Sequence, residues 1–138
     1  MMISSRGRYA LRVMIDLAEH RDEGLIPMKD VAQRQGLSLK YLERILPVLS
    51  KNHYVEGTHG KGGGYRLTRA PEEYPVGDIL RLTEGGLAPV ACLACDAEKC
   101  EREDTCRTHP LWTGLYDVIN DYLDHVTIAD LMQKDTSI

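Results

Sequence analysis

The spacing of apolar residues along the first third of the chain predicts two helices. Apolar side chains recur at helical intervals over residues 9–18, and either Ser4 or Ser5 can cap this helix. They cover more than one stripe, so we expect the helix to be buried on two sides. A shorter helix over 28–34 stops at Gly36, because glycine readily adopts the left-handed conformation that ends a helix.

The next segment carries the most informative pattern. Ser38 is a natural N-cap, and Leu37 and Leu42 are placed to form a hydrophobic staple. Apolar residues at 42, 45, 46 and 49 define one helix face, and the charged residues fall on the other side. This arrangement is typical of a helix-turn-helix. Pro47 lies on the outward stripe, where it removes one backbone hydrogen bond at about 3 kcal/mol, and we expect a kink rather than a break.

A glycine-rich hairpin follows directly. Short strands are predicted over 54–56 and 64–68, and the tip between them is almost free of bulky side chains. Such a wing brings the backbone close to a phosphate chain or a minor groove, with His59 and Lys61 supplying donors or charge. The alternatives are a flexible hairpin and a nucleotide-phosphate loop, although the spacing of residues 60–64 does not match a P-loop.

The second half predicts further helices around an irregular stretch. One helix over 76–83 ends at Gly85, and residues 87–108 show no sustained period. Thr108 can cap a last long helix that starts near Pro110. Its apolar stripe is Leu111, Leu115, Val118, Ile119, Tyr122 and Val126. This stripe packs either on its own domain or on a twin, and we expect dimerisation. Thr127 and Asp130 then form a capping pair for a short final helix that ends near Gln133.

The expected fold is therefore mainly α with a small β-wing. We divide the chain into a winged helix-turn-helix domain over 1–86, a Cys-rich loop over 87–109, and a dimerisation helix with a short C-terminal helix over 110–138. A length of 138 residues with 43% apolar and 28% charged residues suits a compact globular protein. No apolar run approaches the ~20 residues of a membrane helix, and the N-terminus lacks a signal core, so we expect a cytoplasmic protein without membrane contact.

Charge is divided unevenly. Residues 1–69 hold 12 Lys or Arg and 7 Asp or Glu, a balance of +5, whereas residues 70–138 hold 5 and 14, a balance of −9. A basic first half on an acidic chain indicates a surface for a polyanion on that part alone.

All four cysteines lie within fifteen residues, in the pattern Cys92-x2-Cys95-x4-Cys100-x5-Cys106-x2-His109. In a cytosolic protein such clustering favours a metal site or thiol redox chemistry over structural disulfides. Only the first pair fits a zinc knuckle, and several thiolates on a flexible loop also suit an iron–sulfur cluster. The spacing leaves three alternatives open: a cluster, zinc, and a redox switch.

Four segments make the chain similar to the IscR family of winged-helix regulators. They are residues 5–11 (SRGRYAL), 36–43 (GLSLKYLE), 60–65 (GKGGGY) and 106–112 (CRTHPLW). The match is collinear and covers nearly the whole chain. The resemblance implies a homodimeric repressor or activator that binds double-stranded DNA, and an iron–sulfur cluster in the Cys-rich loop. Relatives of this kind govern cluster assembly, sense nitric oxide or control cysteine metabolism.

The resemblance also implies ligands. Cys92, Cys100, Cys106 and His109 match the family's ligand positions, and three cysteines with one histidine favour a 2Fe–2S cluster. The interval from Cys92 to Cys100 is longer than in IscR, and the additional Cys95 could replace Cys92. Arg8 stands where the nitric oxide sensors carry an acidic ligand, which argues against that subtype.

The family's DNA contacts fall on the second helix of the motif, at Ser38, Lys40, Tyr41, Glu43 and Arg44. A carboxylate there can accept from cytosine N4 and is repelled by phosphate, so Glu43 can act as a selectivity gate. On the wing, His59 replaces an arginine of IscR, which predicts weaker or pH-dependent attraction to the minor groove.

We therefore expect a transcription regulator whose promoter binding depends on an iron–sulfur cluster and which controls cluster biogenesis or related iron, sulfur or redox genes. One alternative is a zinc-stabilised or thiol-switch regulator of the same fold, for example of cysteine metabolism. Another is a zinc-stabilised adaptor that binds protein. We do not expect an enzyme, because the chain shows no Ser/His/Asp order, nucleotide fingerprint or paired acid and base carboxylates.

Overall fold

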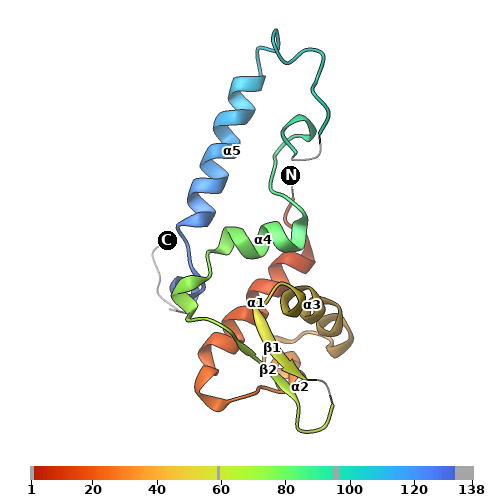
Figure 1. Cartoon of the computed structure of the whole chain (residues 1–138), viewed down its shortest axis with the longest axis vertical. Coiled ribbons are helices and arrows are strands. Elements are labelled where there is room, and N and C mark those ends of the chain that lie inside the picture. The colour runs from red at the N-terminus through yellow and green to blue at the C-terminus, as the bar shows by residue number, and fades with distance from the viewer. Residues whose placement is uncertain (1, 59, 95–96, 133–138) are drawn as a thin grey trace.

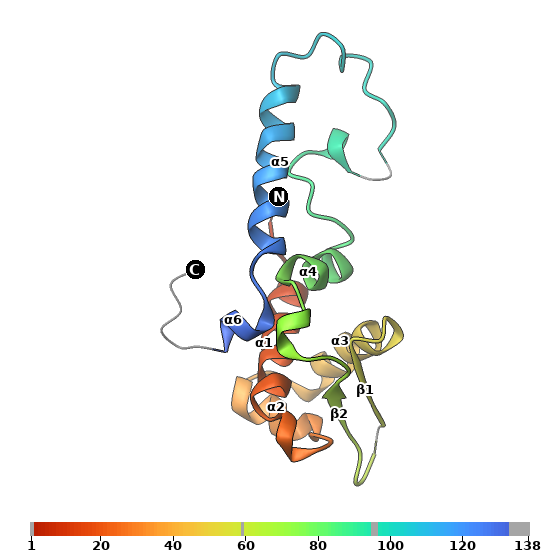
Figure 2. The same cartoon turned by 60° about the vertical axis from the view of Figure 1, so that its left-hand side comes forward.

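The computed structural model describes residues 2–58, 60–94 and 97–132. Its main elements are α1 (Ser5–Glu19), α2 (Met28–Gln35), α3 (Leu39–Lys51), β1 (Val55–Thr58), β2 (Gly64–Leu67), α4 (Val76–Glu84), α5 (His109–Asp124) and α6 (Ile128–Leu131). All elements except α5 form one packed body, and α5 projects from this body as a rod (Figures 1 and 2). Within the described ranges, no helix is long and apolar enough to cross a membrane.

Three of the predicted helix caps are confirmed. The Ser4 side chain accepts a hydrogen bond from the Gly7 amide at the start of α1. Helix α2 ends at Gly36, whose φ of 65° and ψ of 35° are left-handed. The Ser38 side chain accepts from the Tyr41 amide at 3.0 Å and starts α3. This helix continues through Pro47, so the proline does not break it.

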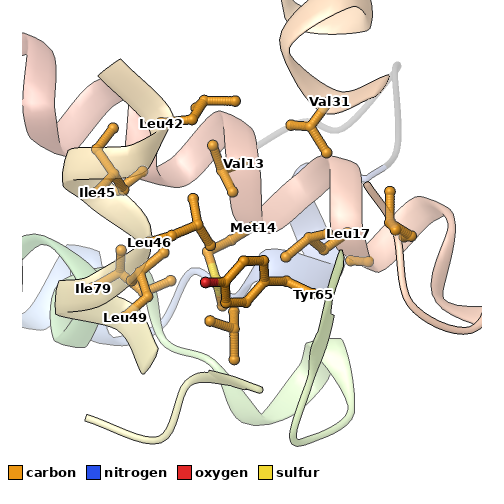
Figure 3. Packing of buried hydrophobic residues seen from close by; sticks show 14 of the residues in the cluster. Val13, Met14, Leu17, Val31, Leu42, Ile45, Leu46, Leu49, Tyr65 and Ile79 are labelled. Carbon is orange, nitrogen blue, oxygen red and sulfur yellow. The ribbon is translucent and has the colours of Figure 1, made fainter. Parts of the chain in front are cut away.

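The main core lies between α1 and α3. Figure 3 shows the buried face of α1 meeting that of α3, with side chains from α2, β2 and α4 filling the space around them. The labelled residues are Val13, Met14, Leu17, Val31, Leu42, Ile45, Leu46, Leu49, Tyr65 and Ile79, each at most 4% exposed. Full burial of such a side chain contributes about 1.5–3 kcal/mol, so this packing is what holds α3 in place.

The wing is an antiparallel hairpin with Val55 opposite Leu67 and Thr58 opposite Gly64. Its base is tied down by Tyr74, which is 1% exposed. The Tyr74 hydroxyl donates to the Tyr54 carbonyl at 2.7 Å and accepts from the Thr68 amide at 3.1 Å. The hairpin therefore leaves the body in a fixed direction, beside α3.

The chain returns to the body after α5. The amide of Val76 donates to the carbonyl of Val126 at 2.7 Å, and the amide of Ile128 to that of Tyr74 at 3.0 Å. Ile128, at the start of α6, is fully buried and belongs to the main core. The predicted capping pair of Thr127 and Asp130 is confirmed. The predicted end of this helix near Gln133 lies outside the described residues.

One predicted cap is wrong. Thr108 occupies the N-cap position of α5, but its side chain makes no capping hydrogen bond, and its φ of −94° and ψ of −12° are helical rather than extended. The hydroxyl lies instead 3.3 Å from the thiol of Cys106. Because an N-cap side chain needs an extended backbone to reach the free amides of the helix, this hydroxyl is available to the cysteine.

Candidate nucleic-acid interface and cysteine loop

Helix α3 presents a polar face to solvent. Leu42, Ile45, Leu46 and Leu49 are buried, which turns the opposite side of the helix outward. Of the residues predicted to contact DNA, Ser38, Lys40, Glu43 and Arg44 are exposed on this side or at its start. Such a helix, held by its apolar face and free on its polar one, has the form that enters a major groove.

Tyr41 differs from the other predicted contacts because it is half-buried. Its ring packs edge-on against that of Tyr9, with the centroids 5.2 Å apart, and its hydroxyl lies 3.4 Å from the Ser5 hydroxyl. Sequence reasoning missed this edge of α1, which flanks the start of α3. The available signal was the spacing of Ser5, Tyr9 and Arg12, which places all three on one side of the helix.

The cations near α3 are unpaired. Across the described part of the chain, Arg6, Arg8, Lys40, Arg44 and Lys61 form no ion pair and are exposed. A cation without an ion-pair partner can neutralise a phosphate without first breaking an ion pair with a carboxylate. The positive balance of the first half is therefore available to a polyanion.

The wing and α3 border a common hollow of about 450 Å³. Glu43 of α3 and Lys61 of the wing tip both line it, together with Leu39 and the tip glycines. Two of the predicted DNA contacts from different elements are thus brought to one place. His59 lies outside the described residues.

A buried carboxylate, also missed from the sequence, joins α1 to α2. Asp16 is 1% exposed and accepts from Arg34 Nη2 at 2.7 Å and Arg34 Nε at 3.0 Å. Gln35 Nε2 donates to the same carboxylate at 3.0 Å. The hydrogen bond with Asp16 raises the pKa of the Arg34 guanidinium above its ordinary value. This clamp fixes the first helix of the helix-turn-helix against α1.

Of the predicted metal ligands, Cys92, Cys100 and Cys106 lie on the stretch between α4 and α5, and His109 is the first residue of α5. Cys92 and Cys100 are exposed, Cys106 is partly exposed, and all three are free of disulfides. Among the described side chains, no three of the types His, Cys, Asp and Glu are grouped closely enough to hold a metal ion. The structure therefore places these cysteines on one loop but does not bring them together with His109. Cys95 lies outside the described residues.

Cys106 contacts Thr108 at the start of α5, with its thiol 3.3 Å from the Thr108 hydroxyl. The hydroxyl and amide of Thr108 lower the pKa of the Cys106 thiol, with smaller contributions from the His109 amide and the charge of Arg102. The thiolate is the form that binds metal ions. The donors present, soft thiols and one imidazole on a loop outside the core, fit an iron–sulfur cluster chemically.

Helix α5 has two different apolar faces. Tyr116, Ile119 and Leu123 pack on the body, against a cluster that contains Leu80 and Val126. The other face is open: the exposed fractions are 60% for Leu111, 41% for Leu115, 65% for Val118 and 52% for Tyr122. These residues follow the 4-3-4 spacing of a coiled-coil seam. The stripe predicted from sequence is thus divided, since Ile119 and Val126 face the body.

These features define the chain as a winged helix-turn-helix DNA-binding protein. Two helices joined at a glycine turn present a polar recognition face, and a two-stranded wing stands beside it. The chain belongs to the Rrf2 family, because the model of that family, described as an iron-dependent transcriptional regulator, matches residues 3–134. It is a transcriptional regulator and not an enzyme.

Individual relatives agree with this assignment. The HTH-type transcriptional regulator IscR of Pectobacterium carotovorum is 39% identical over 134 residues, which cover 97% of this chain and 80% of that protein. The structure of T. potens IscR matches with a TM-score of 0.76 and 36% identity, over 96% of this chain and 86% of that one. CymR, described as the global cysteine regulator of B. subtilis, matches with a TM-score of 0.76 and 37% identity over 96% of both chains. The resemblance to the IscR family and the predicted fold class are confirmed.

Proposed function

We propose that the protein binds promoter DNA as a homodimer in the cytoplasm and that an iron–sulfur cluster in residues 87–109 controls this binding. One observation carries the proposal: the free thiols of Cys92, Cys100 and Cys106 lie on the loop that runs directly into α5, whose open face is apolar. Cluster binding or loss at these thiols would therefore act on the residues that lead directly into α5, the helix that would join two copies.

The DNA contacts follow from the exposed polar face of α3. Lys40 and Arg44 would neutralise phosphate or donate to guanine, and Glu43 would accept from cytosine N4 and oppose phosphate nearby. Ser38 and Tyr41 would contact the backbone at the start of the helix. The wing tip would follow the neighbouring phosphates through Lys61 and His59, because its glycines leave the backbone accessible.

The second copy would cover the open face of α5. This face is formed by Leu111, Leu115, Val118 and Tyr122. Regularly spaced apolar side chains with this much exposure are typical of an interaction surface rather than of a helix face that stays in water. Pairing of two such faces gives a two-fold symmetric dimer, which matches a palindromic operator. In this arrangement residues 1–86 read DNA, residues 87–109 sense and residues 110–138 join the copies.

The cluster would be held by Cys92, Cys100, Cys106 and His109. Three thiolates and one imidazole suit a 2Fe–2S cluster, with Cys95 as the spare thiol. When bound, the cluster supplies a redox-active and oxygen-sensitive centre. The chain's own part is to hold it on a loop outside the core, so that occupancy orders residues next to α5 without disturbing the packed body.

The test begins with protein purified anaerobically. We expect visible absorption with iron and acid-labile sulfide in equal amounts, lost in Cys92→Ala, Cys100→Ala and Cys106→Ala and kept in the matched control Cys95→Ala. DNA duplexes selected from a random pool are then titrated with loaded and metal-free protein. A colourless protein after reconstitution refutes the cluster, and equal affinities of both forms at every selected duplex refute the control of DNA binding.

The second candidate is a zinc-stabilised or thiol-switch regulator of the same fold. It is supported by the structural likeness to CymR and by the exposure of the thiols. Zinc in a colourless preparation would favour the first form. Reversible loss of DNA binding on oxidation of metal-free protein, abolished in the cysteine variants, would favour the second.

A further inference from the structure

One arginine joins the DNA-binding body to the projecting helix. Arg81 of α4 donates through Nη1 to Asp124 Oδ1 at 2.8 Å and through Nη2 to Asp124 Oδ2 at 3.0 Å. Nη2 also donates to Asn120 Oδ1 at 2.9 Å, and Nη1 to Asp78 Oδ1 of its own helix at 3.3 Å. We call Arg81, Asn120 and Asp124 the Arg81 clasp.

The clasp supplies direction rather than stability. The side chains of Arg81 and Asp124 are 32% and 41% exposed, and ion pairs in contact with water contribute little to folding. The planar guanidinium instead fixes the orientation of α5 relative to α4. Its two parallel hydrogen bonds to the Asp124 carboxylate and its third to the Asn120 side chain, one turn earlier on α5, are satisfied together at only one angle between the two helices. The apolar contacts between α4 and α5 have no such directionality.

The clasp also lies at the base of a lever. It holds the end of α5 that adjoins the body, and the helix extends away from the body from there (Figures 1 and 2). The apolar face of this helix is exposed. At about 1.5 Å per residue, the stretch 111–124 forms an arm of about 20 Å. A small rotation of α5 about the clasp therefore moves the far end of α5 by ångströms relative to α3. In a two-fold symmetric dimer, the distance between the two copies of α3 changes by twice this displacement.

The space beside the clasp is full. A Cβ added at Gly77 of α4 would lie 3.0 Å from Arg81 Nη1 and would overlap Asp124 Oδ1 at 2.2 Å. A methyl group at this position must push the carboxylate away from the guanidinium without changing any charge. It offers an independent way to disturb the clasp.

We propose that the Arg81 clasp sets the angle between α5 and α3 and thereby the spacing of the two half-sites that the dimer reads. Arg81 is a positioning residue: it touches no DNA, but it holds the two recognition helices at one separation. This inference rests on the proposed function, namely dimerisation through α5 and DNA reading through α3. Half-sites of dimeric helix-turn-helix proteins lie about 34 Å apart, and successive base pairs lie about 3.4 Å apart. A displacement of the two copies of α3 by a few ångströms therefore changes the preferred half-site separation by about one base pair.

The experiment selects duplexes from a random 40-base-pair pool with the full chain and then measures affinity for the selected palindrome with its centre shortened or lengthened in single base pairs. For wild-type protein we expect one preferred spacing, with affinity at least tenfold weaker one base pair away. For Arg81→Met, Asp124→Asn and Gly77→Ala we expect the same half-site sequence, but a preference reduced to threefold or less. Arg21→Met is the matched control, because it removes an equal charge from an exposed residue outside α4 and α5 and should keep the tenfold preference.

Three outcomes decide the proposal. A flattened spacing profile with an unchanged half-site supports it. An unchanged, sharp profile in all three variants overturns it, and the use of three variants keeps the test valid if one of them fails to fold. Wild-type protein that selects no palindrome, or that stays monomeric in sedimentation, overturns the proposed function and the inference together.

Discussion

Replacing Asp16 by Asn tests whether the clamp between α1 and α2 stabilises the helix-turn-helix. The carboxylate is buried and accepts three hydrogen bonds from Arg34 and Gln35, at 2.7, 3.0 and 3.0 Å. An asparagine keeps the shape but presents an NH2 group, which cannot accept, to at least one of these donors. The variant therefore loses both a charge and part of the hydrogen-bond set.

The expected magnitude follows from the exposure of the partners. Hydrogen bonds to charged groups contribute about 1.5–3 kcal/mol each when they are shielded from water. The Arg34 side chain is 34% exposed and can turn to solvent, so screening reduces this contribution. We expect Asp16→Asn to lower the free energy of unfolding by about 2 kcal/mol. For a chain of this size that corresponds to a fall of about 4–8 °C in Tm.

The assay is urea and thermal unfolding of the metal-free protein, followed by circular dichroism. Arg34→Met and the double variant complete a cycle, and we expect the double variant to be about 1 kcal/mol more stable than the sum of the single effects predicts, because both changes break the same bonds. Asp22→Asn, at an exposed aspartate just after α1, is the matched control and should stay within about 0.5 kcal/mol of wild type. A wild-type stability for Asp16→Asn, or strictly additive effects, would refute the reasoning.

Three further predictions concern DNA binding and assembly. Leu115→Asp places a charge on the open face of α5, and we expect a monomer in analytical ultracentrifugation. Lys40→Ala and Arg44→Ala each remove an unpaired cation from both copies of the dimer, and each should lower the steepness of log affinity against log salt concentration by about 1.8, which is about 0.9 for each lost phosphate contact. Gly57→Ala puts a Cβ 1.9 Å from the Gly64 carbonyl oxygen, so the two strands cannot keep their register, and both Tm and DNA affinity should fall.

Each of these has a control on the same chain. Asp117→Asn changes a charge on α5 outside the open face and should leave the dimer intact. Lys99→Ala removes a cation from the cysteine loop and should leave the salt dependence unchanged. A dimeric Leu115→Asp protein, an unchanged salt dependence in the α3 variants, or a Gly57→Ala protein with wild-type Tm and affinity would each contradict the corresponding prediction.

The local elements could be predicted because their signals are local. A serine before an apolar run at helical spacing marks the start of α3, and Gly36 marks the end of α2, since both act through hydrogen bonds or backbone angles within a few residues. The exposure of Lys40, Glu43 and Arg44 followed from the same periodicity. The wing followed from two short strands around a glycine-rich tip.

Features that join distant segments could not be predicted in this way. Three features depend on residues at least 18 positions apart in the chain. They are the clamp on Asp16, the Arg81 clasp and the burial of Ile128 in the main core. Thr108 shows the same limit at short range: its residue type suits a cap, but the backbone conformation at this position directs its hydroxyl to Cys106. The convergence of the predicted metal ligands is likewise a matter of loop conformation, which the spacing of the cysteines does not specify.

The sequence by itself determined the class of the protein, the helix-turn-helix with its wing, and the chemical nature of the cysteine loop, because these depend on periodicity, on capping and on which atoms can donate electrons to a metal. The tertiary structure decided how the parts are joined. It divided the apolar residues of α5 between a face packed on the body and a face left open, and it placed Arg81 where one guanidinium fixes the direction of that helix. The physical reason is that periodicity shows which residues avoid water, whereas only the packed arrangement determines which surface covers them.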